Sequence, residues 1–320
     1  MKTAVRPNTG LIVMLLLVVL VALALILMIA NPDLRSRRQG AEATVDPHEG
    51  QVYIYDGFDW VWMTPLEGVP VNDFAKEEFQ MVGNTPVYLG SGYETILGVD
   101  VSEHQYEVDW KQAKEAGVDF AFIRIGRRGY TEGGLFNDPW FEKNFQGARD
   151  NAVLVGVYFY SQAVTEEEAL EEADFVLGRL EERKLDLPIV YDWEKIDNED
   201  AEIARTRDLD METRTDCALA FCKRVEAAGY DACVYFNRNL GYYGYDLSRL
   251  TDYRFWFALP VNPPDLCWPS FYYKLDIWQY SFTEQIPGIE GETDMNMLFM
   301  PLPQSTSSPD ETTESPSPTN

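Results

Sequence analysis

Short runs of β-favouring residues alternate with helical stretches between residues 96 and 300, and this alternation constrains the fold more than any other feature. Strands are predicted at 96–102, 118–126, 153–161, 187–194, 231–237, 253–260, 272–280 and 294–300. Helices are predicted at 109–117, 138–151, 165–184 and 211–230. In the last third of the chain, loops replace the expected helices.

Alternating strands and helices imply a parallel sheet with right-handed crossovers. About eight strands in this span predict an α/β fold, an irregular TIM-like (β/α) barrel over residues 96–302. An open, doubly wound sheet is the alternative. No glycine-rich phosphate-binding fingerprint follows the first strand, which disfavours that alternative.

Several helix ends carry capping signals. Gly117 is a natural C-cap, and Asp138 with Pro139 suits the start of a helix. Thr165 and Glu168 have the spacing of a capping box, which predicts a helix that begins after Thr165.

Residues 11–30 form an apolar run without charge or proline. About 20 such residues cross the hydrocarbon core of a bilayer, so we predict a transmembrane helix, preceded by a short N-terminal tail at 1–10. A cleaved signal peptide is the alternative. Its apolar region is usually only about 7–15 residues long, and Met28 stands where a small residue is expected.

The remaining segments differ in composition from the barrel. Residues 31–50 are polar and predict a flexible stalk. Residues 51–95 alternate apolar and polar positions and predict a small β-rich extension. Residues 303–320 are rich in Pro, Ser, Thr and acids, so they predict a disordered tail.

Trp60 and Trp62 stand two positions apart within this extension. Aromatic faces suit the apolar faces of sugars, so the pair could form a sugar-stacking surface. Alternate positions of a strand share one face, and such pairs more often belong to a small core, which is the interpretation we favour.

Charge and composition exclude several classes of partner. The formal net charge is −27, which argues against nucleic acids and against anionic lipid surfaces, because both require a basic face. No Cys/His cluster has zinc-ligand spacing, and His48 and His104 form no catalytic set. We therefore predict no cofactor and no metal.

Four acids fall at the ends of predicted strands. Asp192 and Glu194 close the fourth strand, where side chains two positions apart point the same way. Asp100 ends the first strand and Asp294 begins the last, although the pattern does not place Asp294 relative to the mouth. In such barrels the reactive groups lie at the carboxyl ends of strands. Strand-end caps, an ion pair with Arg124, or a hard-cation site are the alternatives.

Separated motifs across residues 96–300 resemble the signatures of glycoside hydrolase family 25, the Chalaropsis-type lysozymes or N-acetylmuramidases. They read LGVDVSEHQYEVDW, FAFIRIGRRG, VLVGVYFYS, IVYDWE, YFN and DIWQYSFTEQIPGIEGETDMN. The resemblance implies a β/α barrel that hydrolyses the β-1,4 bond from N-acetylmuramic acid to N-acetylglucosamine in peptidoglycan glycan strands. It makes Glu194 the general acid and Asp192 its carboxylate partner, with Asp100 and Asp294 completing an acidic floor. Tyr106 is a departure, because the family often has glycine there.

The chemistry agrees with these roles. Glycoside hydrolysis needs an acid to protonate the leaving oxygen and negative charge to stabilise an oxocarbenium-like transition state. Three aspartates close to Glu194 would hold it protonated, because like charges disfavour a further ionisation. Asp192 could position water, attack the sugar, or orient the substrate's own N-acetyl group.

Aromatic residues at strand ends are candidates for lining a sugar groove, with core packing as the alternative for each. They are Tyr158, Tyr160, Tyr235, Trp278 and Tyr280.

The predicted activity also implies a location. We predict a single-pass protein of the cell membrane, held by residues 11–30, with its catalytic domain on the extracytoplasmic side. The side follows from the activity, because the Lys and Arg count around the span favours the opposite orientation by one residue. The alternative functions are a catalytically silent cell-wall glycan-binding module and a hydrolase of another N-acetylhexosamine polymer, such as chitin.

Overall fold

The computed structural model describes residues 46–196 and 199–302. The predicted segments at 1–10, 11–30 and 303–320, and the stalk as far as residue 45, lie outside these ranges. The chain divides into two units after Val52, and the unit that begins at Tyr53 contains the barrel. Of the other unit, residues 46–52 are described, and they form a turn that leads into the first strand. Within the described ranges, no helix has both the length and the apolar character needed to cross a membrane.

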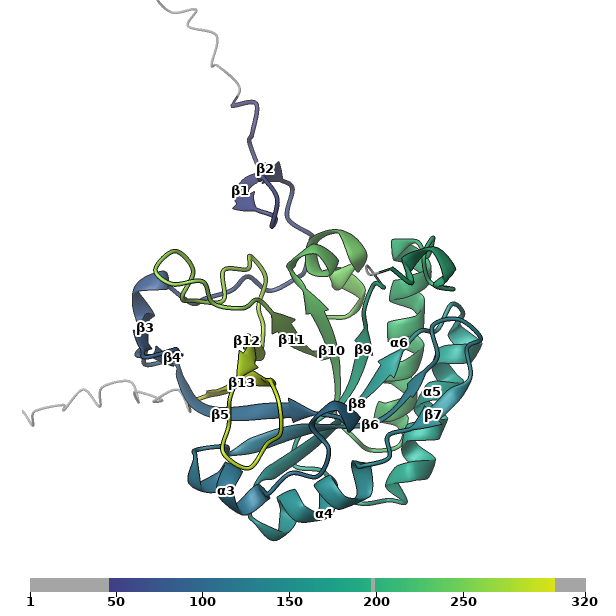
Figure 1. The fold of residues 1–320 in the computed structure, drawn as a ribbon. Helices are drawn as coiled ribbons and strands as arrows, with labels where there is room; N and C mark the ends of the chain where they lie inside the picture. Colours follow the sequence, from purple (N-terminus) through teal and green to yellow (C-terminus); the bar gives the residue numbers. More distant parts are fainter. Residues whose placement is uncertain (1–45, 197–198, 303–320) are drawn as a thin grey trace, which may run out of the picture. The chain divides into compact units, whose positions relative to one another are not determined.

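Eight of the described strands close into a barrel (Figure 1). Around the wall they follow the order β5 (Tyr93–Val101), β6 (Phe120–Arg128), β8 (Leu154–Ser161), β9 (Ile189–Trp193), β10 (Ala232–Asn237), β11 (Arg254–Ala258), β12 (Ile277–Glu284) and β13 (Thr293–Pro301). The wall closes because β5 pairs with β6 on one side and with β13 on the other. The predicted barrel is confirmed, and the open doubly wound sheet is wrong.

The last strand runs against the others. Seven of the described barrel strands are parallel: β5, β6, β8, β9, β10, β11 and β12. Strand β13 is antiparallel to both of its neighbours, β12 and β5. The prediction that all strands of the sheet run parallel is therefore wrong for β13. Residues 285–292 connect β12 to β13, and they are fewer than the dozen or so residues, roughly, that a parallel crossover needs. A short unpredicted strand, β7 (Leu135–Asn137), pairs with β6 outside the barrel.

Helices follow the early strands and become short later. The described α-helices are α3 (Trp110–Glu115), α4 (Phe141–Asp150), α5 (Glu166–Leu180) and α6 (Met211–Ala227). The shorter turns are η1 (Lys76–Glu78), η2 (Glu103–Gln105), η3 (Ala201–Ile203), η4 (Leu240–Gly244, a π-helix) and η5 (Leu247–Arg249). Residues 259–276, between β11 and β12, contain no helix, in agreement with the predicted irregularity of the last third.

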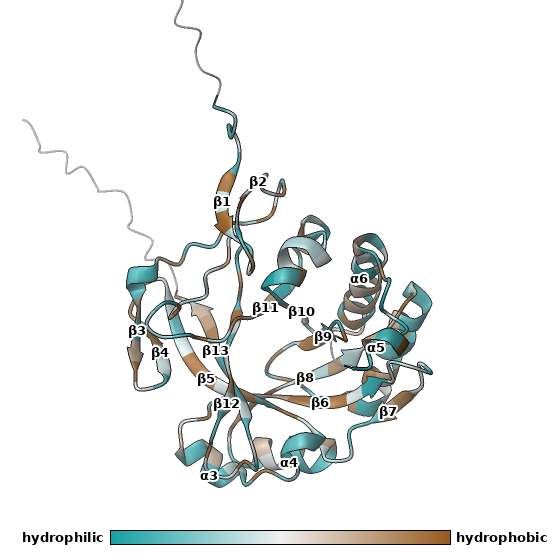
Figure 2. Cartoon of the chain, turned by 45° about the horizontal axis from the view of Figure 1, so that its top comes forward, coloured by the Kyte–Doolittle hydropathy of each residue, from teal (hydrophilic) through white to brown (hydrophobic). Residues whose placement is uncertain are grey.

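Alternation along each strand separates an interior cluster from an outer layer. The outer layer packs the strands against the helices, and in Figure 2 β6 is mostly hydrophobic whereas α4 is mostly hydrophilic. The residues of the interior cluster are Phe120, Phe122, Tyr158, Val190, Cys233, Tyr235, Trp256, Ala258, Ile277 and Leu298. This cluster fills the barrel, so the interior is a packed core and not an open pore.

The capping signals are realised in part. Gly117 has a φ of 100°, and the Thr165 hydroxyl accepts from the backbone N–H of Glu168 at 3.3 Å. The Glu168 carboxylate accepts from the N–H of Val164 and not from that of Thr165, so the capping box is incomplete. Helix α4 begins at Phe141, later than predicted, because Asp138 binds the N–H of Trp140 ahead of the helix.

The β-rich extension consists of two hairpins. Strands β3 (Phe79–Val82) and β4 (Thr85–Tyr88) form one, and its Phe79 packs edge-on against Trp278 of β12 with the ring centres 5.8 Å apart. Strands β1 (Val52–Tyr55) and β2 (Trp60–Met63) form the other. Trp60 and Trp62 lie on its exposed face, so the core interpretation of these tryptophans is wrong. The aliphatic face of this hairpin, with Ile54, is the one that packs inward.

Close approach of two strands requires glycine at position 98. Gly98 of β5 pairs with Phe120 of β6, and a Cβ at this position would clash with the carbonyl oxygen and the ring of Phe120. We expect Gly98→Ala to lower the free energy of unfolding by roughly 1–3 kcal/mol, measured by urea unfolding followed by circular dichroism. The control is Gly178→Ala in α5, where the new Cβ meets nothing within 4 Å. Equal stability of the two variants would contradict the steric explanation.

Candidate active site

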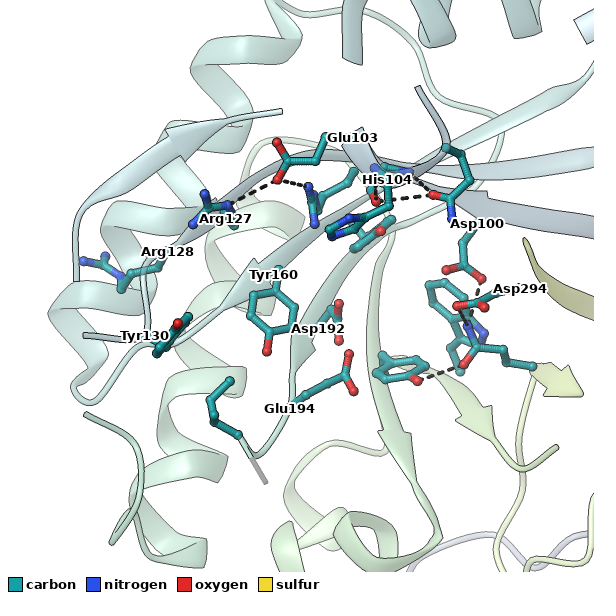
Figure 3. A pocket seen from close by; sticks show the side chains of 18 of the residues that line it. Asp100, Glu103, His104, Arg127, Arg128, Tyr130, Tyr160, Asp192, Glu194 and Asp294 are labelled. Carbon is teal, nitrogen blue, oxygen red and sulfur yellow. Dashed lines mark hydrogen bonds and ion pairs between the residues drawn. The ribbon is translucent and has the colours of Figure 1, made fainter. Parts of the chain in front are cut away.

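The four predicted acids line one cavity at the mouth of the barrel. Asp100, Asp192, Glu194 and Asp294 share a space of 610 Å³, and Figure 3 shows their side chains converging from different strands. The carboxyl groups of Asp192 and Glu194 face one another in this view. Parts of the chain that are far apart in sequence therefore supply one acidic site.

The antiparallel direction of β13 explains the position of Asp294. The carboxyl end of β5 and the amino end of β13 meet at the mouth, and Asp294 pairs in register with Asp100. In a parallel strand the first residues would lie at the opposite end of the barrel. The direction of one strand thus adds the fourth acid to the site.

Strand register also sets the surroundings of Asp192. It pairs with Tyr160 of β8 on one side and with Tyr235 of β10 on the other, so a tyrosine flanks it in each neighbouring strand. Glu194 follows the end of β9 and is less buried. Its backbone carbonyl accepts a hydrogen bond from the Gln162 side chain at 2.9 Å, which holds this part of the mouth in place.

Two amide side chains bind the Asp100 carboxylate. Gln279 and Asn296 each donate to its Oδ2 at 2.8 Å. Both amides are oriented in turn, because Tyr235 donates to the Gln279 oxygen and Trp256 donates to the Asn296 oxygen, each at 2.8 Å. The amide nitrogens are therefore fixed toward Asp100.

Burial favours protonated carboxyl groups in this site. Burial, followed by the charges of Glu194 and Asp100, raises the pKa of Asp192 well above its ordinary value. The Oδ1 atom of Asp192 is buried and has no hydrogen-bond partner within the described part of the chain. Ionising such a group leaves a desolvated charge, so the site retains a proton around Asp192.

Asp100 and Asp294 hold a further proton between them. Burial raises the pKa of Asp100 to about 6, against the lowering effect of the Asn296 and Gln279 hydrogen bonds. Burial and the adjacent Asp100 charge raise the pKa of Asp294 to about 9. Asp294 hydrogen-bonds Asp100, which fits a protonated Asp294 that donates to an ionised Asp100.

Within the described residues, Arg124 forms no ion pair with the four candidate acids Asp100, Asp192, Glu194 and Asp294. Its guanidinium binds Asp138 at 2.9 Å and Glu103 at 2.8 Å, so the alternative of a structural ion pair with Asp192 or Glu194 is wrong. Within the described residues, no group of three or more His, Cys, Asp or Glu side chains is arranged to hold a metal ion.

Three of the five predicted aromatic residues line the cavity: Tyr158, Tyr160 and Tyr235. Trp278 and Tyr280 do not line it and are buried on the outer face of β12. Ile277 belongs to the interior cluster, so the alternating residues Trp278 and Tyr280 point outward. The Trp278 Nε1 donates to the carbonyl of Leu259 at 2.8 Å, which completes its structural role.

Gln279, Asn296 and Trp256 also belong to the site, although they are not among the residues predicted from the sequence. Gln279 is a polar residue between two aromatic ones in a strand, and this alternation could have indicated an inward amide. Tyr106, at a position where the family that the motifs resemble often has glycine, has a φ of 56° at the turn after β5. Glycine adopts this left-handed backbone region without strain, which explains the preference.

The Asp294 proton predicts a pH dependence of stability. The pKa of Asp294 is raised from 3.8 to about 9, so between these values the folded protein holds a proton that the unfolded chain releases. Its contribution to the free energy of unfolding therefore falls as the pH rises through this window. We expect Asp294→Asn to remove this contribution and to gain stability relative to wild type toward about pH 8, measured by urea unfolding across the window. The control is Asp265→Asn on an exposed loop, and an unchanged slope for Asp294→Asn would contradict the assignment.

Comparison with known proteins places the chain in a family. The model of glycosyl hydrolases family 25 matches residues 99–289. The chain is 28% identical over 236 residues to the uncharacterized protein YegX of Escherichia coli O157:H7, covering 69% of this chain and 75% of YegX. It is 26% identical over 254 residues to lysozyme M1 of Streptomyces globisporus, covering 72% and 81%.

A solved structure supports the fold. The modular autolysin LytC of Streptococcus pneumoniae, in complex with a synthetic peptidoglycan ligand, superimposes with a TM-score of 0.52 at 23% identity. The match covers 67% of this chain but only 53% of LytC, so the chain spans about half of that longer protein. The family match covers more than half of the chain and confirms the resemblance seen in the sequence motifs. The chain therefore belongs to glycosyl hydrolases family 25 and is a glycoside hydrolase of the lysozyme type.

Proposed function

We propose that the chain is a muramidase that hydrolyses the β-1,4 bond between N-acetylmuramic acid and N-acetylglucosamine in peptidoglycan. Membership of family 25 and similarity to a protein named lysozyme support this substrate. The observation that carries the proposal is the pair of carboxyl groups, Asp192 and Glu194, facing one another above the acidic floor of the cavity.

Glu194 is the proposed general acid. Its side chain is longer than that of Asp192 and less buried, so it extends further into the cavity that receives the glycosidic oxygen. The hydrogen bond from Gln162 holds the backbone of Glu194 in place. This restricts the positions that its carboxyl group can take relative to the leaving oxygen. Protonation makes that oxygen a leaving group as its bond to the sugar carbon breaks. A water molecule then supplies the hydroxyl group of the new reducing end and returns a proton to the carboxyl pair.

Asp192 is the proposed carboxylate partner. Burial and the charge of Glu194 both favour a proton on Asp192, and we propose that the two carboxyl groups share one proton. When Glu194 transfers the proton to the leaving oxygen, the pair gains one negative charge. At the same time a positive charge develops on the sugar ring. The negative charge of the carboxyl pair attracts this positive charge and so stabilises the transition state.

The aromatic side chains beside the acids are proposed to hold the sugar. Tyr158, Tyr160 and Tyr235 line the same cavity, and Asp192 lies between the last two in register. Asp100 and Asp294 keep the floor acidic on the other side of the cavity. We propose that the sugar ring nearest the cleaved bond lies between these two groups.

The role of Glu194 predicts a large loss of activity on substitution. We expect Glu194→Gln, which keeps the shape and removes the acid, to slow clearing of purified cell-wall suspensions by about 10²–10⁴-fold. Turbidity measures the rate. Glu290→Gln, an exposed glutamate that does not line the cavity, is the matched control and should clear walls at the wild-type rate. Equal clearing by Glu194→Gln would remove the acid role from this residue.

The released fragments identify the bond. A muramidase leaves N-acetylmuramic acid at the new reducing end, which mass analysis after borohydride reduction detects. N-acetylglucosamine at that end would support cleavage of the other glycosidic bond, and release of fragments from chitin alone would support a different polymer. Wall binding without any fragment would support the glycan-binding module.

We also propose that residues 11–30 anchor the enzyme in the cell membrane with the barrel on the extracytoplasmic side, where peptidoglycan lies. The length of the apolar run supports an anchor. We expect protease added outside intact protoplasts to digest the barrel domain of the full-length protein. Protection until the membrane is permeabilised would place the domain on the cytoplasmic side and contradict this orientation.

A further inference from the structure

The hairpin of β1 and β2 exposes an aromatic face to solvent. Tyr53, Tyr55, Trp60 and Trp62 alternate along the two strands on one face and are 54%, 37%, 61% and 45% exposed. Ile54, between the two tyrosines, is buried on the opposite face. Large aromatic residues gathered on a solvent-facing surface, with the aliphatic residues turned inward, indicate a binding surface. We refer to these four residues as the aromatic platform.

The rings of the platform support one another. Tyr53 stacks on Trp60 with the ring centres 5.4 Å apart and the planes at 25°, and it contacts Trp62 at 4.9 Å. Tyr55 contacts Trp60 at 5.8 Å. Because each ring restricts its neighbour, the platform is already ordered before a ligand arrives, and binding costs less conformational entropy.

The turn of the hairpin is fixed to the barrel. Asp56 accepts from the N–H groups of Phe58 and Asp59 at 2.8 and 2.9 Å, and it also accepts from the Tyr243 hydroxyl at 2.7 Å. The guanidinium of Arg238 lies 5.4 Å from the centre of the Tyr55 ring. Tyr243 and Arg238 both belong to the segment that follows β10, so the platform is held by the loop that leaves this strand.

A second cavity adjoins the platform. It has a volume of 390 Å³, and its lining includes Tyr53, Tyr55 and Trp60 of the hairpin together with Tyr242 and Tyr272. A concave space next to flat rings suits a ligand that presents broad apolar faces together with polar edges.

The platform lies on the same side of the barrel as the candidate active site. Strand β10 supplies Tyr235 to the acidic cavity, and the segment after its carboxyl end supplies Tyr243 to the hairpin. The carboxyl ends of the parallel strands surround the mouth. The acidic cavity and the support of the hairpin are therefore both built at the carboxyl end of β10.

Charge limits the ligands that fit this surface. Residues 51–63 contain two aspartates and no lysine or arginine, and the chain as a whole has a net charge of −27. Anionic lipids and nucleic acids would be repelled. Pyranose rings of a β-1,4-linked glycan are uncharged on their C–H faces, and those faces stack on aromatic rings.

We propose that the aromatic platform, with its adjoining cavity, is a second glycan-binding site that holds sugar units of a glycan strand away from the bond being cleaved. The proposal rests on the proposed function, because it takes the same polymer as the ligand. Two sites on one strand act at a high effective concentration, so the platform raises the affinity for long strands and leaves short fragments unaffected.

Binding of peptide-free glycan strands tests the platform. The full-length protein is placed in phosphatidylcholine nanodiscs and carries Glu194→Gln to prevent cleavage. We expect the double change Trp60→Ala and Trp62→Ala to weaken binding of long strands about 5- to 100-fold, measured by co-sedimentation, through the loss of two aromatic contacts. Replacement of both tryptophans by Phe should restore most of the affinity. Leu154→Ala, an exposed apolar residue at the opposite end of the barrel, is the matched control.

Hydrolysis by the otherwise unchanged enzyme separates this proposal from the proposed function. With the platform variants, kcat/KM for short fragments should stay at the wild-type value and fall for long strands. Unchanged affinity and unchanged hydrolysis of long strands would overturn the platform while leaving the role of Glu194 intact. A second measurement uses nanodiscs that contain brominated lipid, which quenches the fluorescence of nearby tryptophans. Quenching in the wild type but not in the double variant would show that the platform faces the membrane, and this result would also overturn the proposal.

Discussion

The antiparallel pairing of β13 with β5 is the constraint on which the site depends. It closes the barrel, and it also brings the first residues of the last strand to the mouth, where Asp294 pairs with Asp100. Asn296, two positions further along β13, binds the same Asp100 carboxylate. A single backbone pairing therefore supplies both the neighbouring carboxyl group of Asp294 and the Asn296 amide that donates to Asp100.

The protons of the site are retained mainly by burial. Asp192 has a buried oxygen without a hydrogen-bond partner within the described residues, and Arg124 is occupied by Asp138 and Glu103. Near neutral pH this arrangement lowers the stability of the folded protein, because the unfolded chain releases the protons that the folded site retains. The apolar layers inside and outside the barrel wall offset that cost.

The predictable part of the structure is the part governed by local patterns. Buried strands and amphipathic helices are recognisable from apolar periodicity, and Asp100 and Asp192 follow from their places at strand ends. Three features depend on long-range pairing, which no local pattern records. They are the reversed direction of β13, the outward orientation of Trp278, and the exposed position of Trp60. In each case the choice between two faces or two directions is made by a neighbouring strand.

The two amides that bind Asp100 restrict which side chains can occupy their positions at the mouth of the barrel. Gln279 and Asn296 donate hydrogen bonds but carry no net charge, so they stabilise the carboxylate without cancelling the negative electrostatic potential of the cavity. An ammonium or guanidinium group at either position would bind Asp100 more strongly and would repel an oxocarbenium-like sugar. Both positions therefore require neutral hydrogen-bond donors. The restriction comes from the negative electrostatic potential of the cavity and not from the space available for a side chain.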